Sequence, residues 1–331
     1  MKFALALLIT AFAALTVFGQ APTLRIVTEI PNLPSELYYG NTKVKPLRLR
    51  PGTNTPITIN DSDFFVSQQY TDFLSRFPDQ SGFDFWISQT IPDPCLPLPQ
   101  QQKDECILGR RDNTSGAFFL SIEFQETGYL VERMFKVAYG DATGTSTIGG
   151  SHTLAVPIVR RSEFLPDTLQ MSNGVVVGVP GWEAVLETNK VAYSNTFVSR
   201  AQFVTAYPTS LTPTAFVTQL FAKAGVSPTA QQQQDAVNEF GGAGNTVDTA
   251  ARGRALRRIA ENPSLNAAEK NKAFVLMQFI GYLRRDPNSG PDTDYSGYDF
   301  WLGKLNQFGG DFHAAQMVRS FLVSGEYNGR F

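Results

Sequence analysis

The chain has 331 residues, of which 42% are hydrophobic and 18% charged, so it can form several domains or an elongated array of repeats. Its 28 basic and 30 acidic residues give a net charge of −2, which argues against nucleic acid as a partner. Two cysteines and two histidines exclude a disulfide-dense scaffold and a four-cysteine zinc site.

The N-terminus has the pattern of an export signal. Residues 3–18 form an apolar run that follows Lys2. The run has the length of a signal-peptide core and is shorter than the roughly 20 residues that span a membrane. We predict a signal peptide over 1–19, cleaved after Gly19 or after Ala21, with an uncleaved anchor helix as the alternative. No second apolar stretch of spanning length follows, so we predict a secreted, periplasmic or surface protein without a membrane span.

Residues 20–60 contain short extended candidates separated by prolines, which predict an extended linker or a small β-like lead-in. The first helix signal follows Asp61, a favourable N-cap residue. Apolar side chains then recur at helical spacing from Phe65 to Phe77, and Pro78 ends the run. These features open the first helical unit, which we assign to residues 61–128.

Cys95 and Cys106 lie 11 positions apart around a proline-rich insertion in this unit. In an oxidising compartment, a pair this close is expected to form a disulfide that contributes about 3 kcal/mol in the chain-entropy model. The spacing differs from Cys-x-x-Cys, which argues against a redox-active pair. We predict a structural disulfide between them.

Weaker copies of the unit follow in residues 129–210 and 211–265. In the second unit, Trp182 matches the tryptophan of the first, and the third unit has none. Residues 140–150 read as a flexible Gly/Thr/Ser connector. Valine-rich segments at 156–159 and 175–179 predict the two strands of a β-hairpin inserted in the second unit.

The motifs of the first unit return clearly in a fourth unit, residues 266–331. Gly82-Phe83-Asp84-Phe85-Trp86 matches Gly297-Tyr298-Asp299-Phe300-Trp301, and the stretch from Phe118 to Phe124 matches that from Phe321 to Tyr327. The intervals between these motifs differ in length between units one and four. The differences fall where loops are expected: a six-residue insertion in unit four and the cysteine insertion in unit one. We predict a mainly α fold of tandem three-helix units, two clear and two degenerate, in which each unit stacks on its neighbours.

These motifs occur in a recognisable order: Phe-Val, Tyr-x-x-Phe-Leu-x-Arg-x-Pro-Asp, Gly-x-x-Phe-Trp and Phe-x-x-Ser-x-Glu-Phe. The order resembles the bacterial family called domain of unknown function 4214, over most of residues 61–331. Unit one carries nearly the whole pattern, and unit four has Asn288 where the pattern has Asp. The resemblance implies export or surface association and no assigned activity. A faint similarity to phycobilisome linker domains implies assembly rather than catalysis.

The repeated residues suggest packing more than chemistry. Trp86 and Trp301, with the phenylalanine before each, could form an aromatic sugar platform, but aromatic residues at helical spacing favour core packing. Arg76 and Arg285 repeat before the proline. Glu123 and Glu326 repeat in the closing motif, so we predict an Arg–Glu ion pair inside each unit. The basic cluster Arg252, Arg254, Arg257 and Arg258 predicts a solvated helix face.

One calcium loop is conceivable in unit four, where five oxygen-bearing side chains lie close in sequence: Asp286, Asn288, Asp292, Asp294 and Asp299. Residues 292–297 match the start of an EF-hand loop, but Gly303 stands where calcium needs a bidentate glutamate. We therefore predict no metal site and no cofactor.

No catalytic motif surrounds His152 or His313, which lie outside serine-hydrolase and zinc-protease patterns. We predict a secreted, non-catalytic helical-repeat protein that binds a protein or glycan at the bacterial cell surface or in the matrix. The alternative is an envelope-glycan hydrolase, which needs two carboxylates at a suitable separation, and the sequence does not single out such a pair.

Overall fold

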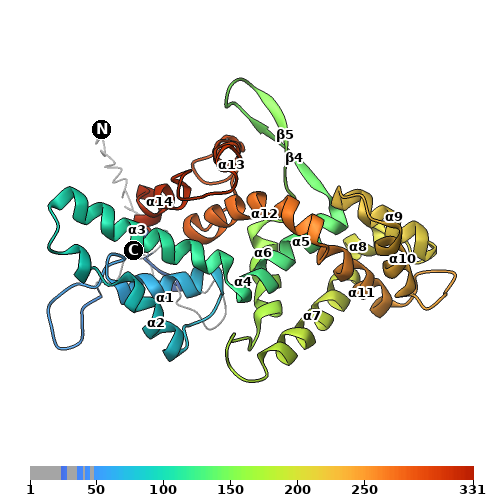
Figure 1. The fold of residues 1–331 in the computed structure, drawn as a ribbon, viewed down its shortest axis with the longest axis horizontal. Helices are drawn as coiled ribbons and strands as arrows, with labels where there is room; N and C mark the ends of the chain where they lie inside the picture. The colour runs from blue at the N-terminus through green and yellow to red at the C-terminus, as the bar shows by residue number, and fades with distance from the viewer. Residues whose placement is uncertain (1–23, 28–35, 40–41, 45–47) are drawn as a thin grey trace, which may run out of the picture.

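The structure is a computed structural model that describes residues 24–27, 36–39, 42–44 and 48–331. The predicted signal peptide, residues 1–19, lies outside the described residues. The described part is mainly helical with a β-hairpin, as the sequence predicted (Figure 1). Three short strands of the lead-in form an antiparallel meander of β1 (Leu24–Val27), β2 (Glu36–Tyr39) and β3 (Thr42–Val44).

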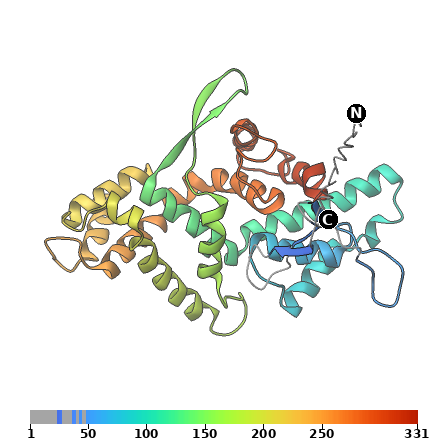
Figure 2. The same ribbon diagram turned by 180° about the vertical axis from the view of Figure 1, so that it is seen from behind.

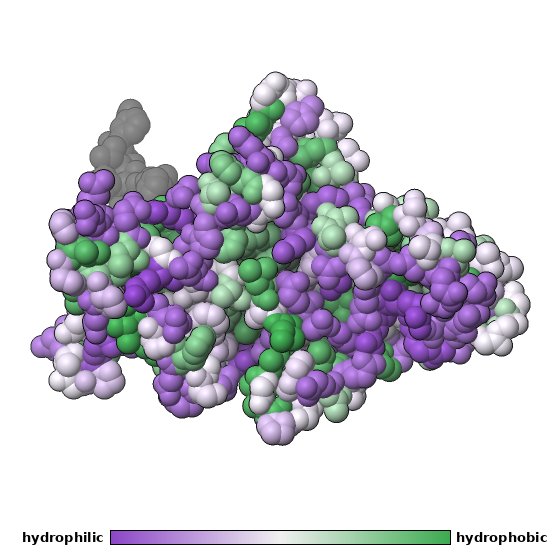
Figure 3. Space-filling model, viewed as in Figure 1, coloured by the Kyte–Doolittle hydropathy of each residue, from purple (hydrophilic) through white to green (hydrophobic). Residues whose placement is uncertain are grey.

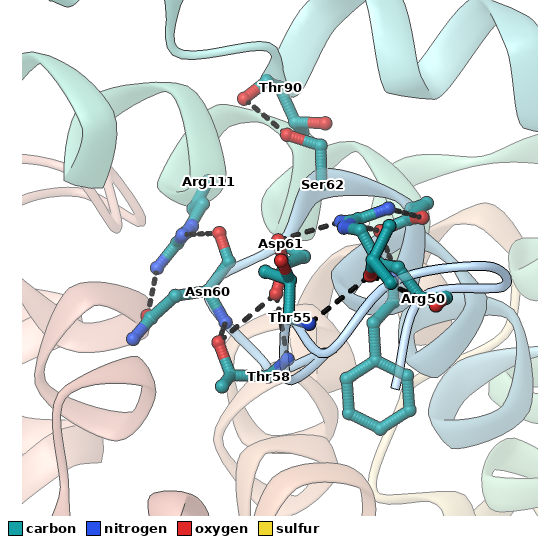
Figure 4. Close-up of polar contacts among 11 residues, drawn as sticks. Arg50, Thr55, Thr58, Asn60, Asp61, Ser62, Thr90 and Arg111 are labelled. Atoms are coloured by element: carbon teal, nitrogen blue, oxygen red, sulfur yellow. Dashed lines mark hydrogen bonds and ion pairs between the residues drawn. The ribbon is translucent and has the colours of Figure 1, made fainter. Parts of the chain in front are cut away.

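Polar contacts fasten the segment after these strands to unit one (Figure 4). Arg50 forms ion pairs with Asp61 (2.7 Å) and Asp63 (3.0 Å), and Arg111 donates to the Asn60 side chain at 2.8 Å. Asp61 is the N-cap residue of the first helix, as predicted, but its carboxylate does not cap the helix. It accepts instead from the Thr58 amide, at 2.7 Å, and from Arg50, so it joins the lead-in to the helix.

Unit one contains four helices in chain order: α1 (Ser62–Phe73), α2 (Gln80–Thr90), α3 (Gln100–Leu120) and α4 (Ile122–Glu126). A short 3₁₀ turn, η1 (Asp93–Cys95), lies between α2 and α3. The predicted disulfide is confirmed, because Cys95 and Cys106 are joined with their Cα atoms 5.7 Å apart. It fixes the turn against the first part of α3.

The middle of the chain forms seven helices: α5 (Gly128–Tyr139), α6 (Arg161–Ser172), α7 (Trp182–Val198), α8 (Ala201–Ala206), α9 (Pro213–Ala224), α10 (Ala230–Asn238) and α11 (Thr249–Ala260). Trp182 begins α7, the helix that also carries the closing-motif residue Phe197. Trp86 lies on the separate middle helix α2. The predicted equivalence of the two tryptophans is therefore wrong, because Trp182 belongs to a different helix of its unit.

A β-hairpin is present, but its strands differ from the predicted pair. It consists of β4 (Asp141–Ser146) and β5 (His152–Pro157), so residues 140–150, predicted as a flexible connector, form a strand and its turn. Residues 175–179 form turns instead of a strand, with Gly178 in a left-handed conformation (φ 95°). Gly144 in β4 is required by packing, because a Cβ there would lie 2.6 Å from the Tyr295 ring.

Unit four begins inside a helix that it shares with unit three. The helix α12 (Pro263–Met277) starts before residue 266. Asn262 caps its N-terminus and accepts from the Ser264 amide at 2.9 Å. It continues as a π-helical stretch, η2 (Gln278–Leu283). The remaining helices are α13 (Ser296–Gln307), α14 (Met317–Leu322) and α15 (Gly325–Asn328).

The first and last units lie side by side, an arrangement that stacking of sequence neighbours alone does not produce. In the left half of Figure 1, α3 contacts α14, and α1 contacts η2. The Phe119 and Phe274 rings stack at 4.2 Å, and Phe73 meets Tyr282 edge-on at 5.2 Å. In the other half, α11 packs on α7, α5 and α9. Figure 2 shows the same two halves from behind, joined through α5, α6 and α12.

Candidate functional site

The repeated arginines are held in the same way in both clear units. Arg76 donates from Nε and Nη2 to the two carboxylate oxygens of Glu123, at 2.6 and 2.8 Å. Arg285 makes the same two contacts with Glu326, at 2.5 and 3.1 Å. The predicted ion pairs are confirmed, and both are bidentate, the geometry that best fixes a guanidinium.

A left-handed residue places each arginine. Ser75 (φ 54°) precedes Arg76, and Arg284 (φ 53°) precedes Arg285. This conformation is uncommon for residues other than glycine, and it follows the end of the opening helix directly before the arginine that contacts the closing motif. We call residues 75–79 and 284–289 the signature turns of units one and four.

The repeated tryptophans are half-buried and pack against the core. Trp86 lies 5.3 Å from Phe118 between ring centroids, and Trp301 lies 5.8 Å from Phe321. The phenylalanines before them remain open to solvent, with Phe85 55% and Phe300 44% exposed. Each tryptophan therefore packs mainly against the core, whereas the phenylalanine before it presents apolar surface to solvent.

The signature turn of unit four forms one wall of a large groove. The groove has a volume of about 1010 Å³, and α6 and α7 form its other walls. Figure 3 shows apolar surface in this lower middle part of the molecule, with hydrophilic surface around it. The lining comprises apolar, amide, hydroxyl and charged side chains: Leu165, Pro166, Leu169, Ala192, Gln170, Asn173, Asn189, Ser162, Ser289, Arg161, Arg284, Arg285 and Asp286.

Most charged side chains in the groove are already paired with other residues of this chain. Arg285 also binds Asp292 at 2.7 Å, and Arg284 binds Asp72, whose side chain is fully buried, at 3.2 Å. The carboxylate of Asp286 accepts from the Arg161 amide at 2.8 Å. The groove therefore presents mainly amide and apolar groups to a ligand.

A smaller cavity of about 240 Å³ lies at the signature turn of unit one, and we call it the signature cavity. Arg76, Glu123 and Asp79 line it together with the rings of Tyr70 and Trp86. Burial and the Asp79 carboxylate raise the pKa of Tyr70 to about 12. Gly82 is required here, because a Cβ would lie 2.2 Å from the Tyr70 hydroxyl.

The five candidate calcium ligands do not converge. Asp286 and Asn288 accept from the Arg161 amide and the Arg160 guanidinium, and Asp292 pairs with Arg285. Asp294 caps the start of α13 through the Ser296 amide, at 2.9 Å, and Asp299 accepts from Ser146 at 2.6 Å. Within the described part of the chain, no group of three or more histidine, cysteine or acidic side chains is placed to hold a metal ion.

The two histidines each meet an aspartate, without forming a catalytic triad. His152 Nε2 lies 3.2 Å from an oxygen of Asp299, and the Ser146 hydroxyl donates to that same oxygen. A nucleophilic serine needs the histidine itself as its base, so this connectivity does not activate Ser146. His313 pairs with Asp112 at 2.6 Å.

A close carboxylate pair does exist, but solvent does not reach it. Glu132 on α5 and Glu269 on α12 are both 2% exposed. Burial and the charge of Glu269 raise the pKa of Glu132 well above its usual value. Lys272 binds Glu269 at 2.9 Å, and Lys136 binds Asp141 at 2.6 Å beside them. The pair is a buried charge cluster between helices.

The arginine cluster of α11 does not form the predicted solvated face at every position. Arg252 is 2% exposed and donates to the Tyr207 carbonyl at 2.6 Å, because it faces the core between α8 and α9. The other three pair with glutamates: Arg254 and Arg258 with Glu239, and Arg257 with Glu187. These pairs leave little uncompensated positive charge for an anion.

No pattern in the sequence predicts the groove. Its walls come from residues 161–192 and 284–289, which are far apart in the chain, and no local pattern connects them. Among the described residues, no helix combines the length and the apolar character needed to cross a membrane. Comparison with family models, with curated proteins and with solved structures gives no significant match.

Proposed function

We propose that this chain is an exported, non-catalytic binding protein whose groove holds an extended segment of an envelope protein or glycan. The observation that carries the proposal is the groove of about 1010 Å³ between α6, α7 and the signature turn of unit four. This volume is at the upper end of the range for small-molecule sites, about 300–1,000 Å³. It suits a length of polymer better than a single metabolite.

The lining supports binding over catalysis. Asn189 lines the groove and donates its amide hydrogens to the carbonyls of Met171 and Asn173, at 3.1 and 2.7 Å, so these bonds hold its side chain in place. Leu165 and Leu169 provide apolar area beside it. Among the described residues that line the groove, Asp286 is the one carboxylate, whereas glycoside hydrolysis normally uses two. The hydrolase alternative therefore lacks its acid–base pair here.

Two features support an extracellular role. The disulfide between Cys95 and Cys106 is typical of oxidising compartments, and the apolar run at residues 3–18 has the length of a signal core. The matching geometry of the two signature turns supports the proposal that units one and four are copies of one repeat, because the repeated motif residues create it.

The proposal is tested with Leu169→Arg, which places a long cation in the groove. The matched control is Val204→Arg on α8, where Val204 is 42% exposed and outside the groove lining. Purified envelope proteins and envelope glycan are each presented to the wild-type protein and to both variants. Binding that Leu169→Arg abolishes and Val204→Arg retains supports the proposal. Release of new reducing ends from the glycan that Asp286→Asn removes would favour the hydrolase instead.

A further inference from the structure

Three large apolar side chains on the elements that form the signature cavity of unit one are exposed: Phe77 (54%), Phe85 (55%) and Ile122 (57%). Ile122 lines the cavity directly. Phe85 lies one helical turn after the lining residue Ser81, so it shares that face of α2. Phe77 follows Arg76 in the signature turn. We call these three side chains the unit-one rim. Clustered exposed apolar side chains of this kind mark interaction surfaces.

The equivalent positions of unit four differ in an informative way. Asp286 replaces Phe77 and Gly325 replaces Ile122, and only Phe300, the counterpart of Phe85, is kept. A segment of the same chain covers the unit-four turn: the Arg161 amide binds Asp286, and the Arg160 guanidinium donates to Asn288 at 2.7 Å. The signature turn of unit four thus already binds a polypeptide segment with a basic residue, which belongs to the same chain.

Val177, from the loop before α7, lines one side of the unit-one cavity, while the rim side chains remain exposed, so the remaining surface is open to a partner. Trp86 and Phe118 give the cavity an aromatic wall that suits an apolar side chain. At its edge, Oδ1 of Asp79 accepts from Ser81 and Gly82, whereas the contact of Oδ2 among the described residues is with Arg76, at the long distance of 3.4 Å. Arg76 therefore lies between two carboxylates, with two hydrogen bonds to Glu123 and one long contact to Asp79, so these three side chains together keep one net negative charge that suits a cation.

From these observations we infer that unit one docks a segment of a partner protein, which inserts an apolar or aromatic side chain into the signature cavity and places a lysine or arginine beside Asp79. The exposed rim favours a polypeptide over a sugar, because a sugar ring in the cavity would leave Phe77 and Ile122 uncovered. This site is separate from the groove, and the inference does not depend on the function proposed for the groove.

The test uses short labelled peptides in which a central phenylalanine is flanked by lysine, by aspartate or by glycine and serine. The full chain is titrated with each peptide, and binding is followed by fluorescence polarisation. We expect the lysine-flanked peptide to bind most tightly and the aspartate-flanked peptide most weakly. Phe85→Ser should weaken the lysine-flanked peptide roughly tenfold, the loss typical of an interface residue that contributes substantially to binding.

The repeat supplies the control, because Phe300→Ser makes the same change at the equivalent exposed position of unit four. We expect this variant to bind like the wild type, and Leu169→Arg in the groove to do so as well. Equal binding of all three peptides would overturn the inference, as would equal losses from Phe85→Ser and Phe300→Ser. Binding of a glycan probe that Phe85→Ser removes, without peptide binding, would also overturn it. Melting midpoints close to the wild-type value show that the variants are folded.

Discussion

Replacing Glu132 by glutamine tests whether the buried charge cluster costs stability at neutral pH. Glu132 on α5 is buried, and its Oε2 has no hydrogen-bond partner in the described part of the chain. Burial and the nearby Glu269 raise its pKa in the folded protein well above the usual 4.5. Arg133, Lys136 and Lys272 act in the opposite direction but do not reverse the shift. Glutamine keeps the shape of the side chain and removes the ionisation.

The sign follows from linkage between protonation and folding. At about pH 4, glutamate in the unfolded chain is largely protonated, and so is Glu132 in the folded protein, so the variant and the wild type should have similar stability. As the pH rises above 4.5, the unfolded chain loses this proton first, and the wild type loses stability until the folded pKa is passed. Each unit by which the folded pKa exceeds the unfolded pKa corresponds to about 1.4 kcal/mol. We therefore expect Glu132→Gln to be more stable than the wild type near pH 8 by at least about 1 kcal/mol.

Thermal unfolding at about pH 4 and pH 8 measures this difference. Each kcal/mol corresponds to a shift of about 2–4 °C for chains of 150–250 residues and to somewhat less here. Glu183→Gln, at an exposed position of α7, is the control and should change neither midpoint. A variant that is less stable than the wild type at pH 8 would refute the reasoning, since it would show that Lys136 and its neighbours stabilise the ionised carboxylate.

Three further predictions concern unit stability and metal binding. Replacing Cys95 and Cys106 by serine should lower the free energy of unfolding by about 3 kcal/mol, measured by denaturant titration; an unchanged midpoint would show that the bond is not formed. Arg76→Ala should cost about 3–5 kcal/mol, because it leaves the almost fully buried Glu123 carboxylate without its cation. A loss below 1 kcal/mol would contradict the buried pair. Millimolar calcium should not change the melting temperature, and a rise that Asp292→Asn with Asp294→Asn abolishes would establish the calcium loop.

Contacts between residues of a repeated motif could be predicted from the sequence. The Arg76–Glu123 pair could be inferred because both residues recur together in unit four, and repetition links them without any knowledge of the fold. The hairpin shows the limit of this reasoning. Valine content favoured residues 175–179 as a strand, whereas the chain uses residues 141–146, where Gly144 admits the Tyr295 ring. That contact joins distant segments, so no local pattern could indicate it.

The same limit applies to the sites. The signature cavity is built almost entirely from the repeated motif, and its main residues were recognisable in the sequence. The groove depends on how α6 lies against unit four, through contacts such as that between Arg160 and Asn288, which are separated by 128 positions. The sequence also could not predict which aromatic side chains are exposed. Phe85 and Trp86 are neighbours of similar chemistry, yet Phe85 faces solvent and Trp86 packs on the core.

The meeting of the first and last units constrains the order in which the molecule can fold. Tyr282 donates to the Gln69 side chain across 213 positions, and Arg330 binds Asp72 across 258. Contacts this distant in sequence form late, since a long loop must close before they stabilise anything. The buried carboxylate of Asp72 lacks its partners Arg284 and Arg330 until nearly the whole chain has been made. Unit one should therefore stay open during synthesis and close last.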